Sequence, residues 1–330
     1  MIVPLIKSAA NGAARRWSVL REREEVQKGL KVLQYSLLAA IIVYLLYKLT
    51  HMGWRDVIGS LPESPWFYLF FGLRFFALPV SELALYEIVW SRPLVRHFFV
   101  FIRKRVYNFA VMGYSGEAFL TIWARRCLSL PHKTILVGVK DNNLLSAFAS
   151  NAATVVLLVT LAATGGLKAG LEAFPGARWL FALAFLSAGT LSVLVMVFRD
   201  KLMALPKGVM PRLISVHGGR QALIILLHAA MYASALPGAP VMAWIMFITM
   251  QLVLSRVPFL PNQDIVYLGA ALSLAPIVGA PEAAVAGMLV AEAGLSQVFN
   301  IAMFFATAHI ARTEIGAQNR NKPLPAGAVS

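Results

Sequence analysis

The residues best suited to chemistry form a turn that places an acid between basic clusters. Residues 113–117 read Gly-Tyr-Ser-Gly-Glu, so Glu117 follows two glycines inside an apolar stretch that runs from 106 to 124. Ionisable groups at membrane depth are costly, and each is a candidate functional group with a partner to be identified. We therefore expect one of two roles for Glu117. It is either the central group of a binding site, or it forms an ion pair with Arg125 or Arg126 that only holds the turn.

A second charged group, Lys140-Asp141-Asn142-Asn143, opens the next apolar run. Either Asp141 or Asn142 is expected to cap the helix that begins here. In the alternative, Asp141 and Lys140 line the same cavity mouth as Glu117. A phosphate-bearing ligand would need cations nearby, although the basic character of cytoplasmic loops accounts for those present more simply. The available cations are Arg126, Lys140, Arg220 and Arg256.

Further polar residues lie inside apolar runs. Arg74 and Glu82 are eight residues apart, two turns along one helix face, which is too far for a direct pair and favours pairing with other helices. Glu292 and Asn300 also share a face and predict a polar stripe toward the bundle interior. His228 is more typical of a hydrogen-bonded core residue than of a proton relay.

The composition excludes an ordinary soluble protein. Of 330 residues, 59% are apolar and 14% are charged, whereas soluble domains carry roughly a quarter charged residues. The net charge of +15 does not indicate nucleic-acid binding, because the basic residues form short clusters between long apolar runs. The single cysteine excludes an internal disulfide, no metal site or cofactor is expected, and no nucleotide, zinc-protease or hydrolase motif is found.

The apolar runs predict an all-α, polytopic integral membrane bundle within residues 30–310. A transmembrane helix needs about 20 mostly apolar residues, and about eight windows meet this criterion. The windows are Leu30–Leu49, Trp66–Trp90, Leu144–Thr164, Trp179–Phe198, Gln221–Leu236, Val241–Leu254, Ile265–Ala280 and Ala283–Ile310.

Basic loops predict the orientation of the chain. Loops rich in Lys and Arg face the cytoplasm, and residues 1–29, 91–105 and 199–220 carry most of them. Both termini are therefore expected on the cytoplasmic side of the inner (plasma) membrane, with 311–330 as a cytoplasmic tail. Residues 13–30 predict either an amphipathic helix on the membrane surface or a solvated helix.

The apolar stretch 106–124 conflicts with this charge rule if it crosses the membrane. Basic residues flank it on both sides, so a crossing would invert every later loop, whereas a re-entrant hairpin keeps both clusters inside. Gly113 and Gly116 permit the reversal. Backbone that leaves helical geometry at membrane depth is buried in protein or lines a wet cavity, so we expect a polar cavity here.

A second interrupted region covers residues 258–281, where Pro-Phe-Leu-Pro-Asn-Gln-Asp at 258–264 precedes further Gly and Pro. Two broken apolar segments, one in each half, indicate a transporter-type site between inverted repeats. No residue-level identity links the halves, so an inverted repeat stays open. Residues 265–310 predict two crossings or a second hairpin.

Several of these motifs resemble one known family. Arg-Val-Tyr-Asn at 105–108, the turn at 113–117 and the charged pair at 140–141 resemble the lysylphosphatidylglycerol synthase transmembrane, or flippase-like, family. Residues 258–264 stand where that family carries a Gly-rich turn and a glutamate. The likeness extends in architecture over about residues 30–310.

The resemblance implies a bundle with broken, re-entrant helices around a lipid-accessible cavity, in a family that moves or modifies membrane lipids. It matches Glu117 to the glutamate after the turn glycine and Asp141 to the acidic position before the next helix. Asn142 stands where an arginine is usual. This sequence lacks the soluble aminoacyl-transferase domain of the synthases, so aminoacyl-lipid synthesis by this chain alone is not expected.

The expected function is lipid transport, with an anionic or phosphate-bearing headgroup bound in the cavity. An intramembrane transferase acting on a lipid or polyprenyl-linked substrate, with Glu117 or Asp141 as general base, is a less favoured alternative. A non-transporting partner in a lipid or polysaccharide assembly complex is another, and the oligomeric state stays open. The expected binding residues are Tyr107, Asn108, Tyr114, Ser115, Glu117, Arg126, Lys140, Asp141, Gln263 and Asp264.

Overall fold

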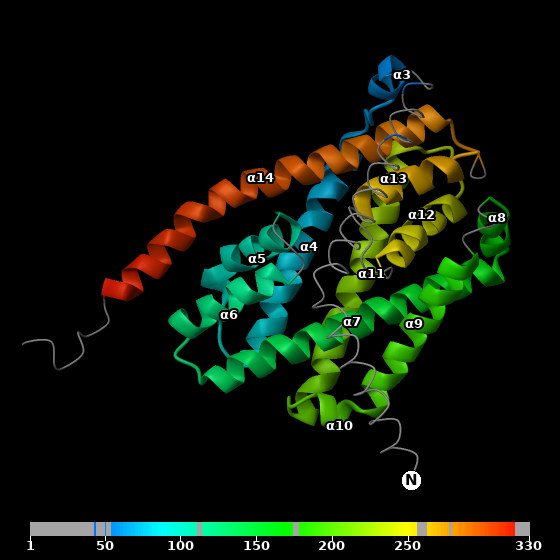
Figure 1. Cartoon of the computed structure of the whole chain (residues 1–330). Helices are drawn as coiled ribbons and strands as arrows, with labels where there is room; N and C mark the ends of the chain where they lie inside the picture. The colour runs from blue at the N-terminus through cyan, green and yellow to red at the C-terminus, as the bar shows by residue number, and fades with distance from the viewer. Residues whose placement is uncertain are drawn as a thin grey trace, which may run out of the picture.

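In a computed structural model, all described secondary structure is helical (Figure 1). The structure describes residues 43, 50, 54–110, 114–173, 178–255, 263–276 and 279–320. Its α-helices are α3 (Trp54–Gly59), α4 (Pro65–Trp90), α5 (Phe98–Ala110), α6 (Ser115–Cys127), α7 (His132–Ala163), α8 (Gly166–Ala173), α9 (Arg178–Val197), α10 (Arg199–Leu202), α11 (Met210–Ala235), α12 (Val241–Leu254), α13 (Gln263–Leu274) and α14 (Glu282–Arg320). Short 3-10 turns are η1 (Val95–His97) and η3 (Lys207–Val209).

Four described helical segments are long and apolar enough to cross a membrane. They are Pro65–Trp90, His132–Ala163, Lys207–Ala235 and Glu282–Thr307. The all-helical, membrane-compatible class expected from composition is therefore confirmed. The window 30–49 lies almost entirely outside the described residues, as do 1–29, the Pro-rich residues 258–262 and the end of the tail.

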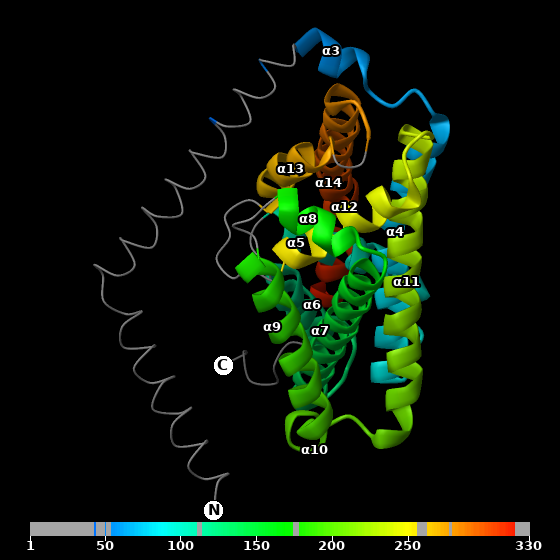
Figure 2. The ribbon, with the colours of Figure 1, turned by 90° about the vertical axis from the view of Figure 1, so that its right-hand side faces the viewer.

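The centre of the bundle is the pair α4 and α11, which lie side by side along most of their length (Figure 2). Helix α7 packs against both of them and against α9, while α14 crosses α5. Buried aromatic and aliphatic side chains, including Phe67, Tyr232 and Phe247, form the largest apolar core. A second core lies where α4 meets the hairpin of α5 and α6.

Helices α5 and α6 form a tightly packed hairpin. The chain breaks before α6 at Tyr114, which adopts the left-handed region with φ of 71°. Ser115 Oγ donates to the Tyr107 carbonyl at 2.6 Å, and the Gly116 amide donates to Asn108 Oδ1 at 2.7 Å. Both bonds join the start of α6 to the last turns of α5. The sequence-based limits of 106–124 are thus narrower than the observed pair of helices.

Two predicted crossings form short helices. The windows 241–254 and 265–280 yield α12 with 14 residues and α13 with 12, whereas a crossing helix needs about 20. Helix α13 ends at Leu274 because Pro276 disfavours helical geometry in the residue before it. The chain then turns through Gly279, whose φ is 67°.

The close approach of α5 and α6 predicts the effect of a single methyl group. A Cβ at Gly116 would collide with the Lys104 carbonyl oxygen and lie 2.8 Å from Asn108 Oδ1. Gly116→Ala is therefore expected to lower the free energy of unfolding in detergent by about 1–3 kcal/mol, the usual cost of overpacking.

The control is Gly72→Ala in the interior of α4, where a Cβ meets nothing within 4 Å. That change is expected to stabilise the protein by up to about 1 kcal/mol through helix propensity. Equal effects of the two changes in denaturant titrations would contradict the hairpin packing.

Candidate functional site

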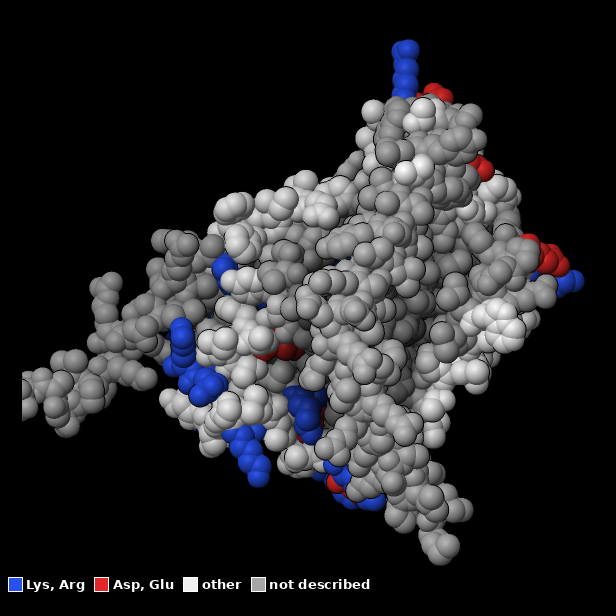
Figure 3. Space-filling model, viewed as in Figure 1, with Lys and Arg blue, Asp and Glu red and all other residues white. Residues whose placement is uncertain are grey.

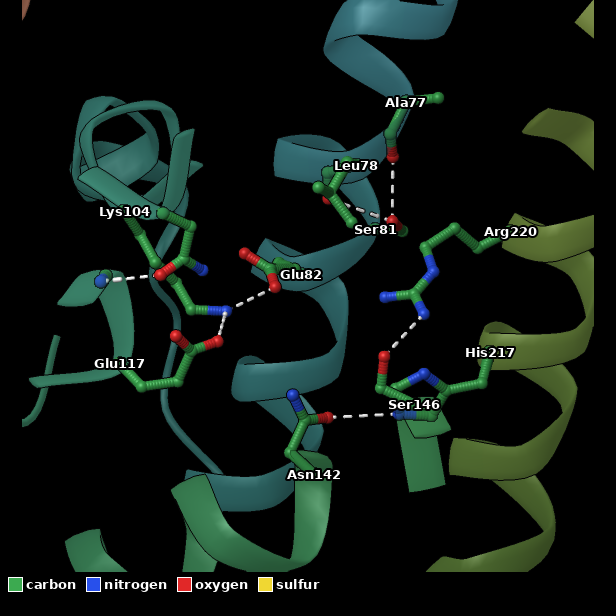
Figure 4. Close-up of polar contacts among 12 residues, drawn as sticks. Ala77, Leu78, Ser81, Glu82, Lys104, Glu117, Asn142, Ser146, His217 and Arg220 are labelled. Atoms are coloured by element: carbon green, nitrogen blue, oxygen red, sulfur yellow. Dashed lines mark hydrogen bonds and ion pairs between the residues drawn. The ribbon is translucent and has the colours of Figure 1, made fainter. Parts of the chain in front are cut away.

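A buried lysine joins the hairpin to the central helix. Lys104 on α5 donates to Glu82 Oε1 on α4, and its Nζ lies 3.1 Å from Glu117 Oε1 on α6 (Figure 4). The Lys104 side chain is 2% exposed, and its Nζ lies 5.7 Å from the centre of the Tyr86 ring. We call Glu82, Lys104 and Glu117 the lysine triad.

The lysine triad assigns Glu117 a partner that sequence reasoning missed. Arg125 and Arg126 are exposed, so the expected ion pair between Glu117 and one of them is wrong. One signal could have found Lys104: it follows Phe101 by three residues and therefore shares its buried face. Glu117 Oε2 is buried and has no hydrogen-bond partner among the described residues.

A second polar cluster joins α4, α11, α13 and α14. Arg74 pairs with Glu292 and donates through Nη1 to His228 Nδ1 at 3.0 Å. Tyr232 donates to Glu292 Oε2 at 2.8 Å, and its oxygen lies 2.8 Å from the Tyr267 hydroxyl. Because the Tyr232 proton points to Glu292, Tyr267 is the donor between the tyrosines. We call these five residues the arginine cluster.

The arginine cluster agrees with the expectation that Arg74 pairs with another helix and that His228 is a hydrogen-bonded core residue. Its members come from four helices that are far apart in the sequence, and only His228 and Tyr232 share one helix, so spacing within one helix could not reveal the whole set. Glu292 was singled out as part of a polar stripe, and the structure gives that stripe a partner in Arg74.

A cavity of about 270 Å³ adjoins the arginine cluster. Arg74, Tyr267 and Glu292 line it, together with Arg105 from α5. The Arg105 guanidinium lies 4.2 Å from the centre of the Phe75 ring. Within the described residues, Arg105 Nε has no hydrogen-bond partner, and no ion pair to Arg105 is found. The cavity therefore holds two guanidinium groups and one carboxylate.

Lys140 and Asp141 make contacts outside both polar clusters. Asp141 Oδ2 accepts hydrogen bonds from the Ala204 and Leu205 amides at 2.7 and 2.9 Å. Lys140 Nζ lies 2.8 Å from Asp141 Oδ1 and donates to the Leu202 carbonyl. These bonds join α7 to the last residue of α10 and to the loop that follows it. The expected helix cap is wrong, because α7 begins at His132, nine residues before Asp141.

The other expected site residues divide into two groups. Tyr107, Asn108 and Ser115 make hydrogen bonds that build the hairpin, while Tyr114 at its tip is 74% exposed. The residues of the second group belong to neither polar cluster, or their side chains are not described. Arg126 is exposed on α6, and Gln263 and Asp264 begin α13 with side chains that are not described.

A third polar contact lies between α7 and α11. Asn142 Oδ1 is 3.1 Å from His217 Nε2, and Arg220 donates to Ser146 Oγ at 2.9 Å (Figure 4). Arg220 was expected at the cytoplasmic rim, but it is buried within α11. Arg256 lies outside the described residues.

No group of His, Cys, Asp and Glu in the described residues could hold a metal ion. No family model, curated protein or solved structure matches the chain. The functional argument therefore depends on the geometry of the cavity and of the two charged clusters.

Removal of the triad's cation should be costly. Lys104→Met leaves Glu82 and Glu117 buried without a cation, and breaking a buried pair in this way costs about 3–5 kcal/mol. We expect that loss in the free energy of unfolding in detergent. The double variant Lys104→Met with Glu82→Gln is expected to recover part of it, because one of the two uncompensated charges is removed.

The control is Lys133→Met, which changes an exposed lysine near the start of α7. Surface substitutions usually change stability by less than about 0.5 kcal/mol. A Lys104→Met variant as stable as Lys133→Met would show that the triad does not hold the hairpin.

Proposed function

We propose that this chain is a multi-pass membrane protein that binds the phosphate-bearing headgroup of a lipid and moves the lipid between leaflets. The observation that carries the proposal is Arg105, a guanidinium without a carboxylate partner at a cavity between membrane-compatible helices. An uncompensated charge in such surroundings is costly, and an anionic ligand would supply the missing partner.

The charge balance of the cavity favours an anion. Arg74 is neutralised by Glu292, so Arg105 provides the surplus positive charge. Guanidinium groups bind phosphate through paired, charge-assisted hydrogen bonds. Gln251 and Ser296 also line the cavity and offer neutral hydrogen-bonding groups to the rest of a headgroup.

The surroundings of the cavity favour a lipid over a soluble anion. Leu78, Phe109, Ile224, Leu268, Leu289 and Ala293 complete its lining. These side chains come from five different helices, α4, α5, α11, α13 and α14, so the polar groups face a largely apolar wall. A ligand with a charged head and apolar chains matches both parts of the lining.

The hairpin explains how Arg105 reaches membrane depth. Helices α5 and α6 have 13 residues each and are about 20 Å long, which is shorter than a hydrocarbon core of about 30 Å. We therefore retain the re-entrant interpretation of this segment. Helix α13 is similarly short and lies within the second interrupted region, residues 258–281, and two interrupted segments are typical of a transporter-type site.

The distribution of exposed charge supports an orientation. Basic side chains gather at the lower left and bottom of Figure 3, over the ends of α6, α7 and α10. The opposite end of the bundle carries Arg55 and Lys168 beside acids such as Asp56 and Glu63. By the charge rule the basic end faces the cytoplasm of the inner membrane, with both termini on that side.

Labelling of introduced cysteines tests this orientation. In a Cys127→Ala background, Lys207→Cys reports on the basic end and Glu63→Cys on the opposite end, both at exposed positions. A membrane-impermeant maleimide added to intact cells is expected to label only Glu63→Cys. Permeabilised cells should label at both positions. Labelling of Lys207→Cys in intact cells would show that the orientation is the reverse of the one proposed.

Exchange of a labelled lipid tests the function. In vesicles that contain the purified protein and a fluorescent phosphatidylglycerol, label from the inner leaflet is expected to become accessible to a membrane-impermeant quencher, whereas in protein-free vesicles only the outer-leaflet label is quenched. Arg105→Gln should reduce the protein-dependent exchange rate about tenfold or more, because a charge-assisted hydrogen bond contributes about 1.5–3 kcal/mol.

The matched control is Arg125→Gln, which removes an exposed arginine on α6 and is expected to leave exchange unchanged. Thin-layer analysis of the recovered lipid distinguishes the classes of function. Unchanged lipid supports transport, whereas a new lipid product would support the transferase alternative. Exchange that is equal in Arg105→Gln and in the unaltered protein would rule out this cavity as the site.

A further inference from the structure

A long apolar groove runs between α7 and α11, and none of its lining residues belongs to the arginine cluster. Its volume is about 490 Å³, and no charged side chain is among its lining residues. Small residues form much of its walls, including Ala149 and Ala153 on α7 and Gly218 and Ala222 on α11. From Ile214 to Leu226 on α11, the groove extends over about 18 Å.

One buried polar atom in this groove has no partner. His217 lines the groove and is 0% exposed. Its Nε2 lies 3.1 Å from Asn142 Oδ1, which can only accept, so Nε2 carries the hydrogen. In the neutral ring Nδ1 is therefore an acceptor, and within the described residues it has no hydrogen-bond partner. A donor from a ligand would satisfy it.

A second polar group lies one turn farther along the same helix face. Gln221 lines the groove four residues after His217, and its side-chain amide can donate a hydrogen bond. His217 is seven residues from the start of α11 at Met210, or about 10 Å along the helix. The polar groups therefore lie toward the basic end of the bundle, and the groove beyond them is apolar.

We propose that this groove binds diacylglycerol. The free hydroxyl donates to His217 Nδ1, an ester carbonyl accepts from the Gln221 amide, and the acyl chains follow the alanine and glycine walls. A sterol offers a hydroxyl but no ester carbonyl for Gln221. A phospholipid would bring a phosphate to a groove whose lining has no cation. This site is separate from the cavity at Arg105 and does not depend on the proposed transport function.

Photo-crosslinking to the full-length protein in nanodiscs tests the proposal. The probe is a diacylglycerol with a diazirine in one acyl chain, and competition by unlabelled dioleoylglycerol gives its affinity. The 3-O-methyl ether of dioleoylglycerol, which has no O–H donor, is expected to compete about five- to tenfold less well, since it lacks one hydrogen bond. This comparison uses the unaltered protein and needs no folded variant.

Variants then locate the contact. His217→Phe removes the acceptor and should make the alcohol and its ether compete equally. Ala153→Trp fills the groove and should abolish crosslinking, whereas Ala147→Trp on an exposed face of α7 should preserve it. Equal competition by alcohol and ether in the unaltered protein would overturn the proposal. Stronger competition by cholesterol than by dioleoylglycerol would also overturn it, as would crosslinking that survives Ala153→Trp.

Discussion

The ion pairs of Lys104 fix the position of the hairpin, and the cavity depends on that position. Lys104 contacts one acid on the central helix and one on α6, so a single side chain joins three helices. An ammonium group buried to this extent loses its hydration, and its charged form is stabilised only when both carboxylates are in place. The absence of a side chain at Gly116 lets α6 approach the Lys104 backbone closely. Packing and electrostatics therefore select the same geometry.

Helix α4 carries two charged residues that pair with different helices. Arg74 and Glu82 are eight residues apart and share one side of the helix, yet each pairs with a different neighbour. Arg74 pairs with Glu292 on α14, and Glu82 pairs with Lys104 on α5. Arg74 and Glu292 line the cavity, whereas Glu82 and Lys104 do not. Arg105, the residue after Lys104, also lines the cavity.

Local and global features of this chain differed in how far the sequence could predict them. Composition identified the long apolar helices, and the glycines near 113–117 identified the reversal, because both signals are local. Lys104 and Arg105 were missed as interior groups, since they were counted among the charges of a basic loop. The partners of Lys104 and the ring that Arg105 contacts lie on other helices, so only tertiary packing could assign them. Asp141 was misplaced for a related reason: α7 begins before it, at His132.

In the hairpin, two adjacent basic residues make different contacts. Successive residues in a helix point about 100° apart, so Lys104 and Arg105 cannot face the same partner. Lys104 contacts both acids of the triad, and Arg105 is directed to the aromatic ring of Phe75 and the cavity. A straight crossing helix would carry the same residues without the partner from α6. The pairing of α5 with α6 thus fixes one cation through two carboxylates and leaves its neighbour at the cavity without a carboxylate partner among the described residues.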